Sequence, residues 1–235
     1  MGINGLNSPY KHIIWDWNGT LLDDAWFCVE IMNGVLDRRG MSLLTLRRYQ
    51  EVFDFPVIDY YRRLGFDFDE EPFEVSGTEF IVEYEKRRHE LQLQPQAKEI
   101  LQAVLQLDLT QSILSAYKQE TLDELTEYLG VRDYFVRVIG LDNHYAHSKT
   151  ENGKMWMEEM HYGPHEVLMV GDTVHDHEVA QAIGADCVLV LSNHHTEEKL
   201  SSCGVPVLES LREVLPNLHK RVKGDRDEER YSQRI

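Results

Sequence analysis

The chain has 235 residues, 42% of them hydrophobic, which is enough for one large core or a core with a smaller satellite domain. No apolar run is long enough to cross a bilayer and the first ten residues carry no leader-like segment, so we expect a cytoplasmic protein without a membrane partner. Its 24 Lys and Arg against 41 Asp and Glu give a formal charge of −17, which disfavours nucleic acid as a partner. Three widely spaced cysteines argue against a disulfide framework or a zinc cluster.

The first predicted element is a buried strand over residues 11–16 that ends on Asp16. β-Branched and aromatic residues precede Asp16, and Asn18 and Gly19 follow it with backbones that tolerate positive φ. Open α/β sheets place their ligands at the carboxyl ends of strands, so Asp16 is a candidate functional carboxylate. An aspartate before Asn-Gly is also typical of a turn or helix cap, and this motif alone leaves both interpretations open.

Residues 25–93 show amphipathic helical spacing without convincing strands. Within them, residues 75–93 predict one long charged helix. Residues 60–63, two tyrosines followed by two arginines, could meet a ligand, although such a cluster more often packs with a solvated edge. The whole segment is interpreted as a helical insertion.

After Pro95 the pattern alternates between helix and strand. Strands separated by helices of this length indicate a mostly parallel sheet with right-handed crossovers. Residues 223–235 are charged and poor in aliphatic side chains, and we expect a loose tail there. The predicted helices cover residues 96–106, 119–129, 151–162 and 175–183, and the predicted strands cover residues 111–115, 135–140, 166–171 and 186–191.

A second acidic strand end follows the strand predicted at 166–171. If a helix begins near Thr173, Asp172 caps it and Asp176 lies about one turn in, so that both carboxylates can face the strand end. A capped helix with an acidic first turn would explain this pair alone, but Asp16 is a second acidic strand end in the same chain. Carboxylates that converge from neighbouring strands suit a hard, oxygen-seeking cation such as Mg²⁺.

Two further residues fit a phosphate site. Ser115 ends the strand predicted at 111–115 and lies at the mouth of the following helix, whose free amides attract anions. Lys149 lies in the predicted loop before a helix and could supply a point charge to a phosphoryl oxygen. Taken alone, Ser115 could equally be a helix cap, and an isolated loop lysine such as Lys149 is usually just solvated.

These pieces together resemble the haloacid dehalogenase superfamily of phosphotransfer and hydrolase enzymes, over roughly residues 11–191. The resemblance rests on four motifs in the family's order: Asp16-x-Asn18-Gly19-Thr20, Ser115, Lys149 and Gly171-Asp172-x-x-x-Asp176. It implies an α/β fold with a Rossmann-like parallel-sheet core (residues 10–24 and 94–222). It also implies an inserted α-helical cap (residues 25–93) like that of phosphoglycolate phosphatase-like members.

The resemblance further implies a magnesium-dependent phosphatase that hydrolyses a small phosphorylated metabolite through an aspartyl-phosphate, as a monomer or homodimer. By resemblance, Asp16 is the nucleophile, Asn18 and Lys149 belong to the catalytic site, and Thr20, Ser115 and Lys149 bind the phosphoryl group. Mg²⁺ would be held by Asp16, the main-chain carbonyl of Asn18 and Asp172, with Asp176 either a ligand or a support for the ligands. A cation and a lysine would relieve the repulsion between an attacking carboxylate and a phosphate dianion.

Asn18 departs from the family pattern, because phosphatases of the family usually carry there a second aspartate that serves as general acid and base. An amide can do neither, and such a loss typically costs on the order of 10²–10⁴ in rate. Another group, with His175 and His177 nearest in sequence, could move the proton, or the substrate could have a good leaving group. Alternatively, the chain is a weakened enzyme that binds phosphorylated ligands.

Two sister chemistries of the same superfamily are alternatives. A phosphonate-cleaving hydrolase would need a Schiff-base lysine in the insertion, where Lys86 is the single lysine. Metal-free dehalogenase chemistry is disfavoured by the acidic pair Asp172 and Asp176.

Overall fold

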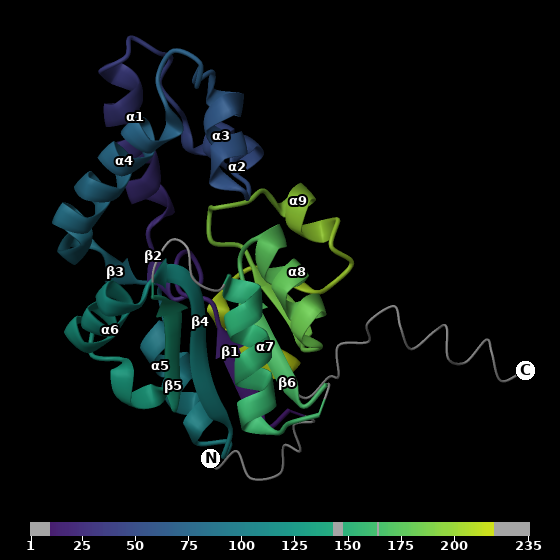
Figure 1. The fold of residues 1–235 in the computed structure, drawn as a ribbon. Helices are drawn as coiled ribbons and strands as arrows, with labels where there is room; N and C mark the ends of the chain where they lie inside the picture. Colours follow the sequence, from purple (N-terminus) through teal and green to yellow (C-terminus); the bar gives the residue numbers. More distant parts are fainter. Residues whose placement is uncertain (1–9, 143–147, 164, 219–235) are drawn as a thin grey trace, which may run out of the picture.

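The computed structural model describes residues 10–142, 148–163 and 165–218 (Figure 1). Within these ranges no helix is both long enough and apolar enough to cross a membrane. The tail predicted at residues 223–235 lies outside the described residues.

A six-stranded sheet forms the centre of the core, in the order β5-β4-β1-β6-β7-β8. Every pairing in it is parallel, which confirms the predicted α/β class. β1 lies in the middle, with Ile14 opposite Ser112 on one neighbour and opposite Met169 on the other. The strands are β1 (His12–Trp15), β4 (Thr110–Lys118), β5 (Arg137–Leu141), β6 (Val167–Gly171), β7 (Asp186–Val190) and β8 (Val207–Leu208).

Helices cover both faces of this sheet (Figure 1). Side chains alternate along β1, so Ile13 and Trp15 join one hydrophobic cluster while Ile14 joins the other. The first cluster contains residues of α5, α6 and α10, and the second contains residues of α7, α8 and α9. These helices are α5 (Ala97–Leu105), α6 (Gln119–Tyr128), α7 (Lys149–Met160), α8 (Val174–Ile183), α9 (Glu197–Ser201) and α10 (Val214–Asn217).

Residues 25–93, called the helical insert below, leave the core between β1 and α5 and lie beyond one end of the sheet (Figure 1). A short antiparallel pair of strands joins the start of this segment to its end. β2 (Leu22–Asp23) directly precedes the insert, whose elements are α1 (Ala25–Asp37), α2 (Leu46–Val52), α3 (Val57–Leu64), α4 (Phe73–Arg87), the 3₁₀ turn Arg88–Glu90 and β3 (Gln92–Leu93).

Two predicted elements end at other residues in the structure. α4 ends at Arg87, and residues 92 and 93 form β3 rather than the last turn of a long helix. β4 continues three residues beyond Ser115 through a shift of register, and α6 begins directly after it. The two-residue strands were missed because they are too short to show a period of two.

Candidate active site

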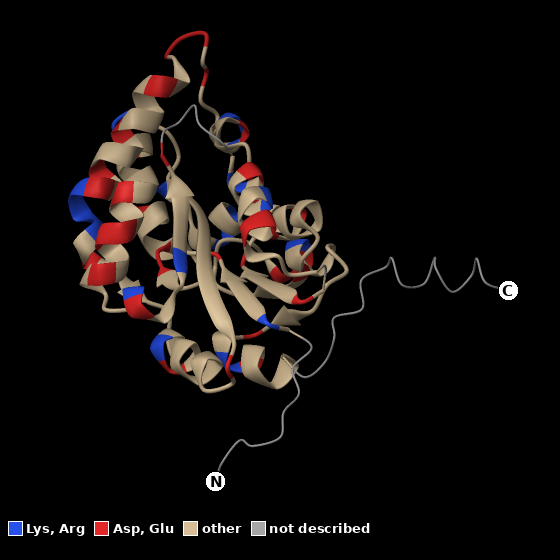
Figure 2. Ribbon diagram, turned by 60° about the horizontal axis from the view of Figure 1, so that its bottom comes forward, with Lys and Arg blue, Asp and Glu red and all other residues tan. Residues whose placement is uncertain are grey.

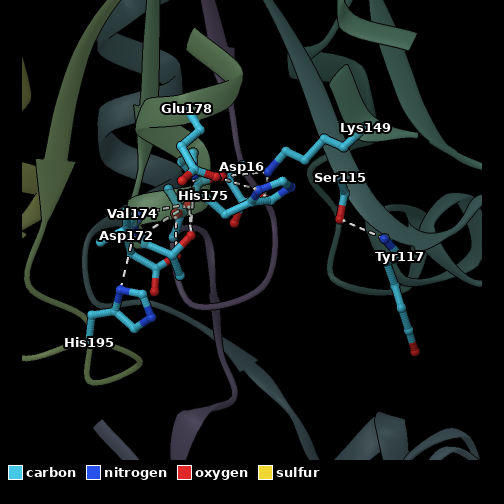
Figure 3. Close-up of polar contacts among 12 residues, drawn as sticks. Asp16, Ser115, Tyr117, Lys149, Asp172, Val174, His175, Glu178 and His195 are labelled. Atoms are coloured by element: carbon cyan, nitrogen blue, oxygen red, sulfur yellow. Dashed lines mark hydrogen bonds and ion pairs between the residues drawn. The ribbon is translucent and has the colours of Figure 1, made fainter. Parts of the chain in front are cut away.

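Asp16 directly follows β1, and its main-chain N–H donates to the carbonyl of Val170 on β6 at 2.9 Å. Its side chain is buried, and Oδ1 forms an ion pair with the ammonium of Lys149. The same ammonium lies 2.5 Å from Oδ1 of Asp176. The structure therefore brings together three of the residues that the sequence assigned to one site (Figure 3).

Asp172 completes the acidic group. Oxygen atoms of Asp16, Asp172 and Asp176 all lie within 4.8 Å of one another, and all three residues are buried. A cluster of buried carboxylate oxygens is the donor set that a hard divalent cation prefers, so the residues fit Mg²⁺.

The pKa values of the three aspartates show that the positive charge beside them does not balance their negative charge. Burial raises the pKa of Asp16 to about 8; Lys149 opposes this shift, and Asp176 and Asp172 add to it. Burial also raises the pKa of Asp172 to about 6, although the charge of His194 acts in the opposite direction. The pKa of Asp176 is lowered, because Lys149 and Thr173 outweigh its burial. Two carboxylates thus resist ionisation here, and a bound cation would relieve that cost.

Two helices, α7 and α8, begin differently from the prediction, and both differences affect the side chains of the site. Thr173, rather than Asp172, caps α8, and its hydroxyl pairs with Asp176 in a reciprocal capping box. The side chain of Asp172 is therefore free of the capping role. Ser148 and Glu151 form the same arrangement at α7, so Lys149 is the first residue of that helix and not a loop residue. The Ser-x-x-Glu pattern in the sequence is the signal that could have placed it.

The backbone at Gly19 lies close to side chains from other segments of the chain. Its φ is +80°, and a Cβ there would clash with the side chains of Asp172 and His194. Gly171 is similar, since a Cβ on it would overlap Asp176. Both glycines are therefore required by close approach at the strand ends.

Thr20 and Ser115 are both buried beside these residues. The hydroxyl of Thr20 donates to Oδ1 of Asp172 at 3.0 Å, so in this structure it orients a carboxylate. The hydroxyl oxygen of Ser115 accepts the main-chain N–H of Tyr117 at 3.1 Å, which leaves its hydrogen available to a ligand (Figure 3). Ser115 lies inside β4 and not at the helix mouth, contrary to the prediction.

Asn18 uses its side chain in a way that the sequence did not suggest. Its amide nitrogen donates to Oδ2 of Asp24 at 2.9 Å and to the hydroxyl of Tyr84 at 3.0 Å. Oδ1 of Asp24 accepts from Nε2 of His194 at 3.0 Å. Burial would lower the pKa of His194, but the charge and hydrogen bond of Asp24 outweigh it and raise that pKa to about 9.

Sequence reasoning missed Asp24, Ser192 and His194. Ser192 and His194 follow β7, and the hydroxyl of Ser192 donates to Oδ2 of Asp172 at 2.7 Å. The rule that ligands gather at strand ends, applied to the last predicted strand as it was to the first, would have found both. Asp24 gives no such signal, because an aspartate before a helix is typical of a cap.

The other candidates form no hydrogen bond with the three aspartates in the part of the chain that the structure describes. His175 is 3.4 Å from Glu178, and its ring packs against Phe55 of the helical insert. His177 is half-buried, and burial lowers its pKa. Lys86 is exposed and lies 3.5 Å from Glu83 on the same helix.

Comparison with known proteins agrees with this geometry. Residues 13–190 match the family model of haloacid dehalogenase-like hydrolases. The phosphoglycolate phosphatases of Vibrio vulnificus strains YJ016 and CMCP6 are each 30% identical over 217 residues, covering 87% of this chain and 94% of the relative.

Solved structures share the fold at lower identity. A putative haloacid dehalogenase-like hydrolase from Bacteroides fragilis has a TM-score of 0.75 at 20% identity, covering 87% of this chain and 99% of the other. A predicted phosphatase from Clostridium acetobutylicum has a TM-score of 0.74 at 18% identity, covering 90% and 97%.

The fold, the buried acidic cluster and these relatives define a hydrolase of the phosphatase class. The chain belongs to the haloacid dehalogenase-like hydrolase family.

Proposed function

We propose that this chain is a magnesium-dependent phosphatase that hydrolyses a small phosphorylated metabolite through an aspartyl-phosphate on Asp16. The observation that carries the proposal is the position of Asp16, which is buried at the end of the central strand and paired with Lys149. Because two relatives are named phosphoglycolate phosphatase, phosphoglycolate is the first substrate to test.

In the first step an oxygen of Asp16 attacks phosphorus, and the bond from phosphorus to the leaving oxygen breaks. The leaving oxygen keeps the electron pair and takes a proton from a water molecule, so that it departs as an alcohol. Lys149 holds Oδ1 of Asp16, so we assign Oδ2 as the attacking atom. In the second step water attacks the acyl phosphate, which releases inorganic phosphate and restores the carboxylate.

We assign Asp16, Asp172 and the main-chain carbonyl of Asn18 as the residues that hold Mg²⁺. When bound, the ion supplies positive charge against the repulsion between carboxylate and phosphate. Asp176 has a supporting role, because its Oδ1 is paired with Lys149 and its Oδ2 accepts from Thr173 at 2.7 Å. Thr20 acts through Asp172, and the hydroxyl hydrogen of Ser115 is assigned to a phosphoryl oxygen.

We also assign the helical insert as a cap over a core formed by residues 10–24 and 94–222. The side chains of Lys149 and Asp16 are only 4% and 9% exposed, so a substrate reaches them after the insert moves away. Closure then excludes water from the reacting atoms.

A phosphonate-cleaving hydrolase is a poorer fit. Its Schiff-base lysine would have to be Lys86, whose side chain is 71% exposed and paired with Glu83. A Schiff-base lysine requires a desolvated pocket or a neighbouring cation, and this exposed amine has a carboxylate as its partner.

The test is the release of inorganic phosphate from phosphoglycolate, from a panel of other phosphorylated metabolites and from p-nitrophenyl phosphate, with Mg²⁺ and with chelator. We expect metal-dependent release that Asp16→Asn lowers by at least about 10³-fold. Asp186→Asn is the matched control, since Asp186 is equally buried but begins β7 at the opposite end of the sheet. Release that survives in Asp16→Asn would refute the assignment.

The covalent step has its own assay. Wild-type protein quenched in acid during turnover of ³²P-labelled substrate should retain a label that hydroxylamine removes, as an acyl phosphate does. Asp16→Asn should retain none. A label that persists in Asp16→Asn would place the covalent chemistry elsewhere.

A further inference from the structure

We propose that Asn18 and Asp24 form an obligate amide–carboxylate pair that fixes the nucleophile turn against the helical insert. Asn18, Asp24, Tyr84 and His194 are then positioning residues for hydrolysis, an inference whose activity readout rests on the proposed function. The amide at position 18 is in this view one half of a pair, and not merely a lost acid–base group.

The first support is a closed set of three hydrogen bonds. The amide of Asn18 donates to Oδ2 of Asp24 and to the hydroxyl of Tyr84, at 2.9 and 3.0 Å. That hydroxyl in turn donates to the same Oδ2 at 2.8 Å. Asp24 and Tyr84 are buried, so each bond is made away from bulk water and its loss leaves a polar atom without a partner.

The second support is the other oxygen of Asp24. Oδ1 accepts from His194, whose Nδ1 lies 2.8 Å from the hydroxyl of Tyr49. Tyr84 belongs to α4 and contacts the carboxylate of Asp24 directly, whereas Tyr49 belongs to α2 and reaches it through His194. The ring of His194 also lies against Gly19, one residue after Asn18. The set therefore joins the nucleophile turn, the insert and the loop after β7.

The third support is the chemistry that Asp24 imposes on position 18. A carboxylate at 18 would face the carboxylate of Asp24 across a hydrogen-bond distance with little solvent between them. Two like charges so placed repel, and the hydrogen bond that the Asn18 amide donates to Asp24 is lost. An aspartate at position 18 is thus incompatible with Asp24, and Asn18 is the residue that Asp24 requires.

The arginines and lysines of the helical insert take no part in this set. The nine arginine and lysine side chains of residues 25–93 all pair with carboxylates, and Figure 2 shows basic and acidic residues interleaved along these helices. Among the described residues, His194 is the charged partner that Asp24 has within the site.

The experiment is a double-mutant cycle of Asn18→Asp, Asp24→Asn and the two together. We expect each single change to lower kcat about tenfold or more, with a smaller effect on KM. The double variant restores one amide and one carboxylate with their positions exchanged, and we expect it to recover about tenfold over Asn18→Asp. Asp23→Asn is the control, because Asp23 is next to Asp24 in the chain but its own carboxylate makes none of these hydrogen bonds.

Hydrogen exchange of the amides of α2 and α4 gives a readout that needs no turnover. We expect faster exchange in both single variants and recovery in the double variant. If wild type releases no phosphate, the proposed function fails, but the exchange cycle still tests the pair.

Two results would overturn the inference. One is a rise in phosphatase rate for Asn18→Asp alone, which would mean that position 18 simply lacked its acid–base group. The other is a double variant whose fold-loss in kcat equals the product of the losses of the two single variants.

If Asn18→Asp does not fold, Tyr84→Phe serves instead, since it removes one hydroxyl and keeps the ring. We expect it to lower kcat about fivefold or more and to speed exchange in α4, and an unchanged kcat would contradict the pair.

Discussion

Lys149 and Asp16 form an ion pair in which neither side chain is more than 9% exposed. A buried pair gains little net stability from its own attraction, because both charges lose their hydration. The loss of one partner is nevertheless costly, since the other charge is left in the same poorly hydrated place. Lys149 also serves Asp176, so its ammonium holds two elements of the site in register.

Replacement of Lys149 by Met should therefore affect stability and turnover together. We expect a loss of about 3 kcal/mol or more in the free energy of unfolding and a fall of about 10²–10³-fold in kcat. Urea denaturation and phosphate release measure the two. Lys154→Met, an exposed change on the same helix, should leave both within about twofold or 0.5 kcal/mol. Near-wild-type turnover in Lys149→Met would remove the lysine from the mechanism.

A comparison of Gly19 with Gly184 separates the cost of backbone strain from the cost of a steric clash. Gly19 and Gly184 have nearly the same φ, +80° and +78°, but only Gly19 has side chains where a Cβ would go. Gly184→Ala should cost about 1–2 kcal/mol of stability and leave activity intact. Gly19→Ala should cost more and abolish phosphate release, because Asp172 and His194 must move. Equal effects of the two changes on activity would contradict this reading.

The sequence predicted most of the fold and the acidic cluster because both follow from strand ends. Asp16 and Asp172 each follow an apolar run, and parallel strands bring such ends to one edge. The Asn18–Asp24–His194 set could not be predicted, because His194 lies 170 residues from Asp24 in the sequence and each member looks like a turn or cap residue in its own context. The strand that contains Ser115 was ended too early in the prediction, because the register shift in β4 leaves no mark in the hydrophobic pattern.

The arginines next to Tyr60 and Tyr61 were candidates for contact with the leaving group. Arg62 pairs with Asp59 at 2.6 Å and is 57% exposed, while Arg63 donates to the carbonyl of Val52 at 3.0 Å. Neither guanidinium is free for a substrate in this structure. Arg62→Ala and Arg63→Ala should each change KM by less than about twofold, measured by phosphate release. A rise of tenfold or more in either would show that the insert presents this arginine to the leaving group.

His12 predicts a pH dependence that has nothing to do with the active site. Its ring lies between the hydroxyls of Thr110 and Ser112, 2.7 Å from each, and burial lowers its pKa from 6.5 to about 4. Between these values the unfolded chain binds a proton that the folded chain does not, so stability rises with pH. The contribution is complete above pH 6.5 and is lost as pH falls through 4, up to about 3 kcal/mol.

Urea denaturation at two pH values, one within this window and one above it, should show that slope in wild type. His12→Gln should flatten it, because the titrating group is gone. An unchanged slope in the variant would assign the pH dependence to other groups.

The chain enters and leaves the helical insert through the paired strands β2 and β3. There the N–H of Gln94 donates to the carbonyl of Leu21 at 2.8 Å, and its side chain donates to the carbonyl of Gly19. Because both ends of the insert leave the core at one place, insert residues that do not contact the core can change without breaking a strand of the main sheet. Tyr49 and Tyr84 do not share that freedom, since they are hydrogen-bonded to His194 and Asp24. Evolution can thus vary the rest of the insert while these two tyrosines and the strand ends stay fixed.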